Sequence, residues 1–284
     1  MSAGVADALG RVHPRAAADA RIVCLVPSLT ELLCELGLTG HIVGRTGFCV
    51  HPRPAVTGIP KMGGTKTPDL RAILDAAPTH LIVNIDENRR DHVDFLSAHI
   101  PHVVVTHPCR PEDNRELFRL FGWIFGALSG VESRAAGLHA AFEAAWTDLG
   151  TSCRGLARLP VLYLIWREPW MTVSRTTYIS ALLSAAGLDT LPEASEVRYP
   201  QFGWADPGVA GARHVLLSSE PYRFGTRHLA EVEARCGRRA HLVDGQMLSW
   251  YGNRAIAGLR YAARLRHELE NGAGIAALRR PARP

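Results

Sequence analysis

One amphipathic stretch in the middle of the chain, residues 129–149, most constrains how the rest of the chain can fold. Its apolar residues recur at steps of four, three, four, three and four, and this spacing lays a single apolar stripe along an α-helix. About twenty residues at a rise of 1.5 Å each make a helix of roughly 30 Å. We therefore predict one long helix here. Its stripe consists of Val131, Ala135, Leu138, Phe142, Ala145 and Leu149.

Short apolar runs alternate with helical patterns on both sides of this helix. Before it, four runs are typical of buried strands, at residues 21–26, 42–45, 81–84 and 103–106. After it, three more follow, at residues 161–166, 214–218 and 241–243. Strands that alternate with helices indicate an α/β fold with mostly parallel sheets. We therefore expect two Rossmann-like α/β lobes joined by one long rigid helix, with a ligand cleft between the lobes at the carboxyl ends of the strands.

The pattern divides the chain into five segments. We expect a disordered N-terminal arm (1–20), an N-terminal α/β lobe (21–128), the connecting helix (129–150), a C-terminal α/β lobe (151–270) and a flexible tail (271–284). An internal similarity supports two related lobes, because TELLCELGL from Thr30 matches SALLSAAGL from Ser180. In addition, the apolar run HLIVN from His80, which is followed by Glu87, matches HVLLS from His214, which is followed by Glu220. Chance likeness between generic strand–helix units is the alternative.

Composition narrows the class of protein. The chain has 284 residues, 47% hydrophobic and 21% charged, which is typical of an ordinary globular protein large enough for two domains. The net charge of +5 comes without a dense basic face interleaved with aromatic residues, so we expect no nucleic-acid partner. No run of 18 apolar residues occurs, so we expect no membrane insertion.

Two features bear on the compartment. The six cysteines are scattered without a CxxC pair, which favours free thiols in a reducing environment over a disulfide framework. Charged residues and a proline interrupt the first 27 residues, so no apolar core of a secretory signal is visible. We therefore expect a cytoplasmic protein, or a periplasmic one if the native start has been trimmed.

Several motifs resemble one known family. They include VPSLTELL from Val26, GGTKTPDL from Gly63 and SWYGNR from Ser249, and the similarity extends over about residues 21–270. Together they resemble the helical-backbone substrate-binding proteins of ABC importers. That class includes the vitamin B12 receptor and receptors for metals, haem and siderophores. The resemblance implies two lobes with the strand order 2-1-3-4 in the first, joined by a single long helix.

The resemblance also implies which residues line the ligand cleft. From the N-terminal lobe these are Pro27, Ser28, Phe48, Thr65, Asn84 and Glu87, and from the C-terminal lobe Trp166, Trp170, Tyr199, Gln246 and Trp250. Cys49 and Arg167 join them on chemical grounds, as a thiol beside the cleft and a bidentate donor between two tryptophans. We expect the aromatic residues to stack on a planar ligand and Asn84, Glu87 and Arg167 to orient it.

Several of these residues are also compatible with a purely structural role. The segment from Trp166 to Trp170 is also compatible with an aromatic packing core and a surface ion pair. Asp86 or Asn88 is compatible with a helix cap, a role that does not exclude Glu87 from a site. Four further residues, Cys49, His51, His107 and Cys109, offer thiols and imidazoles suited to zinc. However, they follow the second and fourth strands, whose ends lie about 14 Å apart in the implied order, which favours two separate loop features.

Three functional hypotheses follow. The first is a cytoplasmic protein that binds a metal chelate, a tetrapyrrole-like molecule (a corrinoid, for example) or another polar planar ligand. The second is the substrate-binding component of an ABC importer for cobalamin, haem or a siderophore. Arg71 and Ala205 stand where the B12-type receptors carry docking acids, with Asp206 next door, so we do not expect docking to a permease. The third is an enzyme recruited from this scaffold, with Cys49 or Glu87 in the chemistry.

Overall fold

The computed structural model describes residues 4–271, and their contacts divide them into two compact units. Unit 1 holds the described residues up to Pro108 together with Glu112–Phe142 and Tyr251–Arg254. Unit 2 holds Cys109–Pro111, Glu143–Trp250 and the described residues from Ala255 onward.

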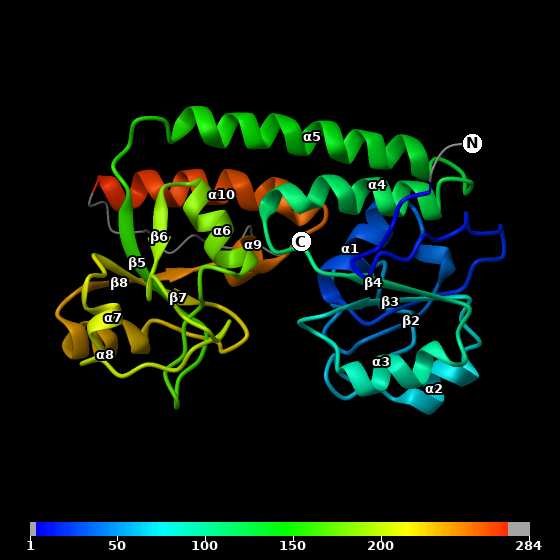
Figure 1. The fold of residues 1–284 in the computed structure, drawn as a ribbon, viewed down its shortest axis with the longest axis horizontal. Coiled ribbons are helices and arrows are strands. Elements are labelled where there is room, and N and C mark those ends of the chain that lie inside the picture. Colours follow the sequence, from blue (N-terminus) through cyan, green and yellow to red (C-terminus); the bar gives the residue numbers. More distant parts are fainter. Residues whose placement is uncertain (1–3, 272–284) are drawn as a thin grey trace. The chain divides into compact units, whose positions relative to one another are not determined.

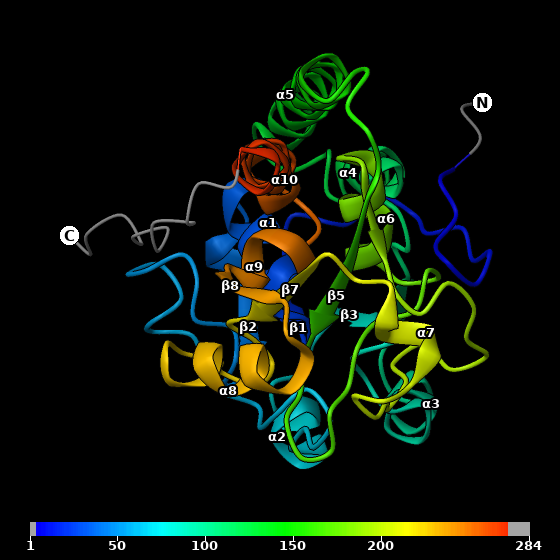
Figure 2. The same ribbon diagram turned by 90° about the vertical axis from the view of Figure 1, so that its left-hand side faces the viewer.

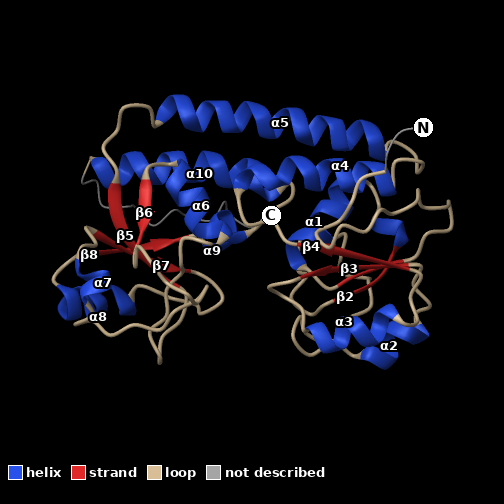
Figure 3. Ribbon diagram, in the orientation of Figure 1, coloured by secondary structure: helices blue, strands red, loops and turns tan. Residues whose placement is uncertain are grey.

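Unit 1 is built on a four-stranded parallel sheet (Figure 3). The strand order is β2-β1-β3-β4, as the resemblance implied, and every neighbouring pair is parallel. The strands follow the buried apolar runs closely, because both faces of a covered parallel sheet require apolar side chains. Their bounds are Ile22–Cys24 (β1), Ile42–Arg45 (β2), His80–Asn84 (β3) and His102–Thr106 (β4).

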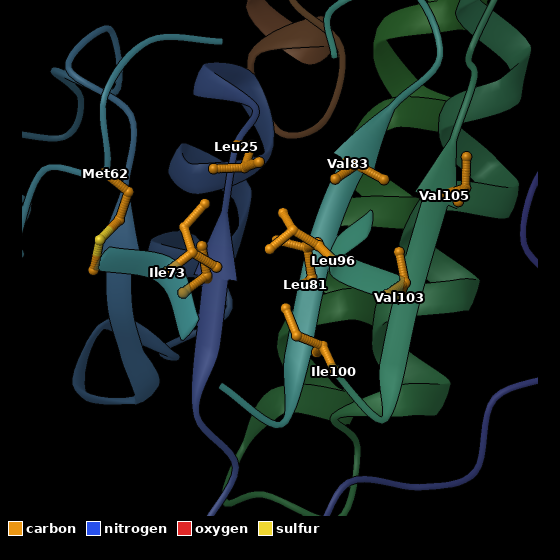
Figure 4. Close-up of a cluster of buried hydrophobic side chains, with 10 residues drawn as sticks. Leu25, Met62, Ile73, Leu81, Val83, Leu96, Ile100, Val103 and Val105 are labelled. Atoms are coloured by element: carbon orange, nitrogen blue, oxygen red, sulfur yellow. The ribbon is translucent and has the colours of Figure 1, made fainter. Parts of the chain in front are cut away.

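Helices cover both faces of this sheet. Figure 1 shows α2 and α3 on one face and α1 and α4 on the other. Alternate residues of the strands point toward α2 and α3, where Ile73 and Leu96 complete a buried cluster (Figure 4). The bounds are Pro27–Glu35 (α1), Leu70–Asp75 (α2), Arg90–Ser97 (α3) and Asn114–Ile124 (α4), with short 3₁₀ turns at Thr39–His41 and Pro111–Asp113.

Unit 2 repeats the same topology, which agrees with the internal similarity of the sequence. Its parallel sheet has the order β6-β5-β7-β8. The strands are Leu159–Leu164 (β5), Leu188–Thr190 (β6), His214–Ser218 (β7) and Arg239–Val243 (β8). The sequence did not predict β6, because its three residues contain a single apolar side chain, Leu188. The two α/β lobes expected from the sequence are thus confirmed.

The helices of unit 2 also form two layers. Figure 1 and Figure 2 show α7 and α8 on one face of the sheet and α6, α9 and α10 on the other. The bounds are Tyr178–Ala185 (α6), Pro207–Ala210 (α7), Arg227–Cys236 (α8), Gly245–Ser249 (α9) and Arg254–Glu270 (α10). Helices α7 and α9 were not predicted, because four or five residues are too short to show a helical period.

The long central helix is confirmed as α5, Val131–Ser152, and the division between the units falls within it. Five of the six residues of the predicted stripe are buried, and Leu138 is partly buried. In unit 1, Phe142 packs edge-on against Phe118 of α4 at 6.2 Å between ring centroids. A side chain at Gly122 of α4 would meet the Cβ of Ala135 at 2.9 Å, so glycine allows α4 and α5 to pack closely.

The N-terminal arm is ordered over residues 4–20, and the expectation of a disordered arm was wrong for these residues. Ala8 N–H donates to Val105 O at 2.9 Å, and the carboxylate of Asp7 accepts from Val105 N–H at 3.1 Å. Trp123 Nε1–H donates to the carbonyl of His13 at 3.0 Å. The arm thus pairs with the free side of the edge strand β4, whose unpaired backbone groups are available for it. Apart from Asn271, the tail expected to be flexible lies outside the described residues.

Candidate functional site

Parallel strands bring the loops that follow them to one edge of each sheet. In unit 1 these loops begin after Cys24, Arg45, Asn84 and Thr106, and in unit 2 after Leu164, Thr190, Ser218 and Val243. Most of the predicted site residues lie in these loops or in the first helical turns after them; Asn84 is the last residue of β3, and Trp250 follows the end of α9. The carboxyl edge of each sheet is therefore the candidate site, as is usual for open α/β sheets.

The long loop of unit 1, residues 46–68, is held in place by a buried arginine. Arg45 is 4% exposed, and its guanidinium donates to Val56 O at 2.8 Å and to Cys49 O at 2.9 Å. These bonds fold the loop back over the end of β2. They leave Phe48 64% exposed, with its ring beside Gly64.

Cys49 belongs to this loop, but its side chain does not reach the surface. Its side chain is fully buried, and its thiol lies 3.1 Å from the hydroxyl groups of both Thr30 and Thr46. Burial raises the pKa of the Cys49 thiol, against the hydrogen bonds of the two threonines, which lower it. A buried thiol with a raised pKa is a poor nucleophile and is closed to a ligand, so the structure disfavours both roles considered for Cys49.

Asn84 also has a structural position. It is 3% exposed, and its Oδ1 accepts hydrogen bonds from Asp86 N–H at 2.8 Å and Glu87 N–H at 3.3 Å. Its amide therefore shapes the turn after β3 and is not placed to orient a ligand. Asn88 ties this turn to the long loop, because its Nδ2 donates to Thr65 O at 3.1 Å.

Glu87 extends from the same turn and is partly exposed. Tyr251 Oη donates to Glu87 Oε1 at 2.5 Å. Burial and the nearby Glu87 carboxylate raise the pKa of Tyr251, so the tyrosine remains a neutral donor at physiological pH. Pro27 and Ser28 open α1 close to this pair; Ser28 is buried and Pro27 partly exposed.

The carboxyl edge of unit 2 presents a large exposed aromatic ring. Trp166, directly after β5, is 40% exposed and contacts Tyr222 edge-on at 5.7 Å between ring centroids. Val197 in the loop after β6 is 60% exposed. Tyr199, in the same loop, and Gln246, in α9, are partly exposed, and Trp250 is 9% exposed.

Trp170 and Arg167 both contact other side chains of unit 2. These contacts fit the alternative interpretation of their segment, an aromatic packing core with a surface ion pair. Trp170 packs against Trp204 at 5.1 Å and stacks on Phe224 at 6.3 Å between centroids, at the edge of the hydrophobic core. Arg167 forms salt bridges to Glu231 at 3.1 Å and to Glu168 at 2.8 Å. The proposed stacking by Trp170 and ligand orientation by Arg167 are therefore not supported by their contacts.

Glu220, which was not predicted as a site residue, is a further polar group at the carboxyl edge of unit 2. It follows β7, and its Oε1 accepts from Ser249 Oγ and from Trp250 Nε1, both at 2.8 Å. Burial raises its pKa, while these two donors lower it. Perturbed carboxyl groups of this kind concentrate at functional sites. The available signal was its match to Glu87 in the internal repeat.

The structure does not assemble the candidate zinc ligands. Among residues 4–271, no three His, Cys, Asp or Glu side chains are grouped so as to hold a metal ion. His107 lies 3.5 Å from the carboxylate of Asp86, whereas Cys109 belongs to unit 2, with its sulfur 3.9 Å from the guanidinium of Arg198. His51 is partly exposed in the long loop of unit 1.

None of the helices within the described part of the chain is long and apolar enough to cross a membrane.

Solved structures with the same fold cover most of the chain. The periplasmic vitamin B12 binding protein of Vibrio cholerae has a TM-score of 0.73 at 16% identity, covering 88% of this chain and 97% of its own. The periplasmic heme-binding protein of Roseiflexus sp. RS-1 has 0.72 at 20%, covering 88% and 99%. A periplasmic heme binding protein of Pseudomonas aeruginosa has 0.69 at 20%, covering 86% and 91%. At these identities the likeness shows the fold alone.

The sequence of the chain, apart from its fold, also identifies a family. No curated protein matches the chain significantly. The family profile described as "Periplasmic binding protein" (Peripla_BP_2), however, matches residues 22–209, about two thirds of the chain. This range includes the whole of the sheet of unit 1, the long helix α5 and the first two strands of unit 2. The chain belongs to the periplasmic binding protein family.

Proposed function

We propose that this chain is a ligand-binding protein whose ligand is a planar metal chelate of the tetrapyrrole kind, bound at the carboxyl edges of its sheets. The observation that carries the proposal is the position of the exposed large apolar side chains. Four of the seven in the described chain lie in carboxyl-edge loops. Two of them belong to each unit, and apolar groups exposed in such loops gain about 25 cal/mol for each Å² that a ligand covers. The four are Phe48, Ile85, Trp166 and Val197.

Family and fold support a ligand of this class. The chain belongs to a family of binding proteins, and structures named for binding vitamin B12 and heme share its fold. Both of those ligands are flat rings around a metal ion, and such rings stack well on aromatic side chains. The ring in the ligand would bring its own metal, so the proposal requires no metal site made by the protein.

The direct test is a binding screen with the full chain. Cyanocobalamin and hemin are added separately to the purified protein, and the melting temperature, the visible spectrum and the mass of the native complex are recorded. A ligand at a hundred times its Kd adds about 2.7 kcal/mol to the free energy of unfolding, which a thermal melt detects. A protein that leaves the melt, spectrum and native mass unchanged with both compounds contradicts the proposal.

Trp166→Ala is expected to weaken binding of the compound identified in that screen by about tenfold or more. The substitution removes an aromatic surface at the edge of unit 2, and stacking with burial of a ring contributes about 1.5 kcal/mol or more. Isothermal titration measures the change in Kd. Phe95→Ala is the matched control, because Phe95 is 46% exposed but lies on α3. Equal effects of the two substitutions would exclude Trp166 from the site.

A second candidate function is that of the substrate-binding component of an ABC importer. It is favoured by an acid at equivalent helix starts in both units: Asp69 caps α2 and Asp206 caps α7, and both residues are exposed. Arg71, which argued against docking, forms a surface salt bridge to Asp75 at 2.9 Å, so part of its charge is balanced. The test is ATP hydrolysis by the permease–ATPase complex of the native host in liposomes, with and without this protein. Unchanged hydrolysis and no co-sedimentation reject the importer role.

A further inference from the structure

Glu220 is a half-buried carboxylate whose hydrogen-bond donors are all neutral. The hydroxyl of Ser249 and the indole of Trp250 each donate to its Oε1 at 2.8 Å. The side chain of Gln246 also hydrogen-bonds to the carboxylate. All three donors lie in one short segment, from α9 to the residue that ends it. The carboxylate is therefore held in a fixed orientation at the end of β7.

No positive charge balances this carboxylate within the described chain. None of the salt bridges among residues 4–271 includes Glu220. A second acid, Asp244, acts on it electrostatically, and this residue caps α9 by accepting from Gln246 N–H at 3.0 Å. A buried charge without a counter-charge is costly to a folded protein, and such positions are retained where a ligand completes them.

The carboxylate also has room for one more partner. A carboxylate offers about four lone-pair sites, and the hydroxyl of Ser249 and the indole of Trp250 both bind to Oε1. The residue is partly exposed and not sealed in the core. A ligand N–H or a positively charged group would complete the hydrogen bonding and the charge balance together. A ligand carboxylate would do neither, and it would add repulsion at close range.

Unit 1 places an acid in the corresponding position. Glu87 follows β3, as Glu220 follows β7, and each of these strands is third in the order of its sheet. Glu87 likewise accepts from a neutral donor, the hydroxyl of Tyr251. In contrast, the positive charge of Arg167 is already paired with two glutamates. Each carboxyl edge thus presents a hydrogen-bond acceptor at the equivalent position of its own sheet.

We propose that Glu220 is a specificity-determining residue that selects ligands with N–H donors or positive charge on their periphery, such as carboxamides, over ligands with peripheral carboxylates. This inference rests on the proposed function, because it names the class of planar chelate that the same site accepts. It also predicts that the acid form of a ring binds more weakly than its amide form. A role for Glu220 in holding the α9 segment alone predicts no such difference.

The experiment compares two probes that share a ring and differ only at the periphery. Dicyanocobinamide carries carboxamides, and dicyanocobyrinic acid carries carboxylates. Hemin and its bis-amide form a parallel porphyrin pair. Tryptophan fluorescence or calorimetry on the full chain gives each Kd. Hydrogen bonds to charged groups contribute about 1.5–3 kcal/mol, so the wild-type protein is expected to bind the amide form about 10–100-fold more tightly.

Glu220→Gln removes the charge and keeps the size of the side chain. It is expected to weaken binding of the amide probe by about tenfold and to strengthen binding of the acid probe, because the repulsion is gone. Misfolding would weaken both probes, so the opposite changes identify selection. Two variants serve as controls: Ser249→Ala removes one neutral donor and keeps the charge, and Glu193→Gln changes an acid with a side chain 77% exposed. Both should keep the preference for the amide form.

The outcomes separate this inference from the proposed function. If Glu220→Gln binds both forms as the wild type does, or if the wild type prefers the acid form, Glu220 does not select the ligand, and the proposed function still stands. Loss of both probes in Glu220→Gln and Ser249→Ala alike assigns the carboxylate a purely structural role and overturns the inference. If neither ring binds the wild-type protein in either form, the proposed function itself fails.

Discussion

Replacing Asp7 with alanine is expected to lower the free energy of unfolding by about 3 kcal/mol, because the substitution leaves several hydrogen-bond donors, some of them buried, without their acceptor. The Asp7 side chain is fully buried. It accepts from the backbone N–H groups of Leu9 at 2.9 Å, Arg11 at 3.0 Å and Val105 at 3.1 Å, and its Oδ2 lies 3.1 Å from His13 Nε2. Burial alone would raise the pKa of Asp7, but these hydrogen bonds hold it below its ordinary value. The ionised form is therefore the one that the fold stabilises.

Urea denaturation at pH 7 measures the loss, and a thermal melt should show a decrease of about 2–4 °C for each kcal/mol. Asp19→Ala is the matched control, since Asp19 is an exposed acid in the same arm and should change the midpoint little. Asp7→Asn should fall between the two, because an amide keeps one acceptor but loses the charge. An unchanged midpoint in Asp7→Ala would mean that the arm does not contribute to the stability of unit 1.

The contacts of the N-terminal arm could not be predicted from its sequence, in contrast to the strands. Strands such as β2 and β7 were predicted with their observed bounds, because a continuous buried run is itself the signal of a covered parallel strand. The arm has no such run. Its order comes from hydrogen bonds to Val105, about a hundred residues away along the chain. The strand β6 was missed for a similar reason: its position is fixed by pairing with β5, and not by its own three residues.

The location of the candidate site was predictable, whereas the direction of its side chains was not. Parallel topology leads every post-strand loop to the carboxyl edge, so positions such as Phe48 and Trp166 followed from the strand assignments. Whether a side chain in such a loop points outward depends on distant packing partners. Trp170 meets Trp204, which lies 34 positions later, and Cys49 meets Thr30 on α1. Neither contact has a local pattern that the sequence reveals.

Acidification from pH 7.5 to pH 4.5 is expected to destabilise the protein by roughly 2–4 kcal/mol through two histidine pairs, each with one buried ring, His80 in the first and His241 in the second. His80 of β3 stacks against His102 of β4 with 4.8 Å between ring centroids, and His214 Nδ1 of β7 lies 3.1 Å from His241 Nε2 of β8. Burial, followed by the neighbouring His102 and His13, lowers the pKa of His80 to about 4. Burial, followed by His214 and Arg239, lowers the pKa of His241 to about 4.

The lowered pKa values of His80 and His241 mean that the free energy of unfolding falls as the pH falls. The folded state holds both rings neutral, while in the unfolded chain each takes a proton near its ordinary pKa of 6.5. The stabilisation is complete above pH 6.5 and is lost as the pH falls from 6.5 toward 4, at roughly 1–2 kcal/mol for each ring after allowance for solvent screening. Glu220, whose pKa is raised, acts in the opposite direction and offsets part of the loss. Asp7 contributes no loss in this window, because its folded pKa lies below its ordinary value of 3.8.

The urea midpoint at the two pH values tests this expectation. The double variant His80→Gln, His241→Gln cannot take up these protons, so its midpoint should fall much less on acidification than that of the wild-type chain. His99→Gln, at an exposed position just after α3, should leave the pH dependence unchanged. A decline in the double variant as steep as in the wild type would place the acid sensitivity elsewhere. A smaller decline would show that the histidine pairs on β3–β4 and β7–β8 account for the acid sensitivity of the fold.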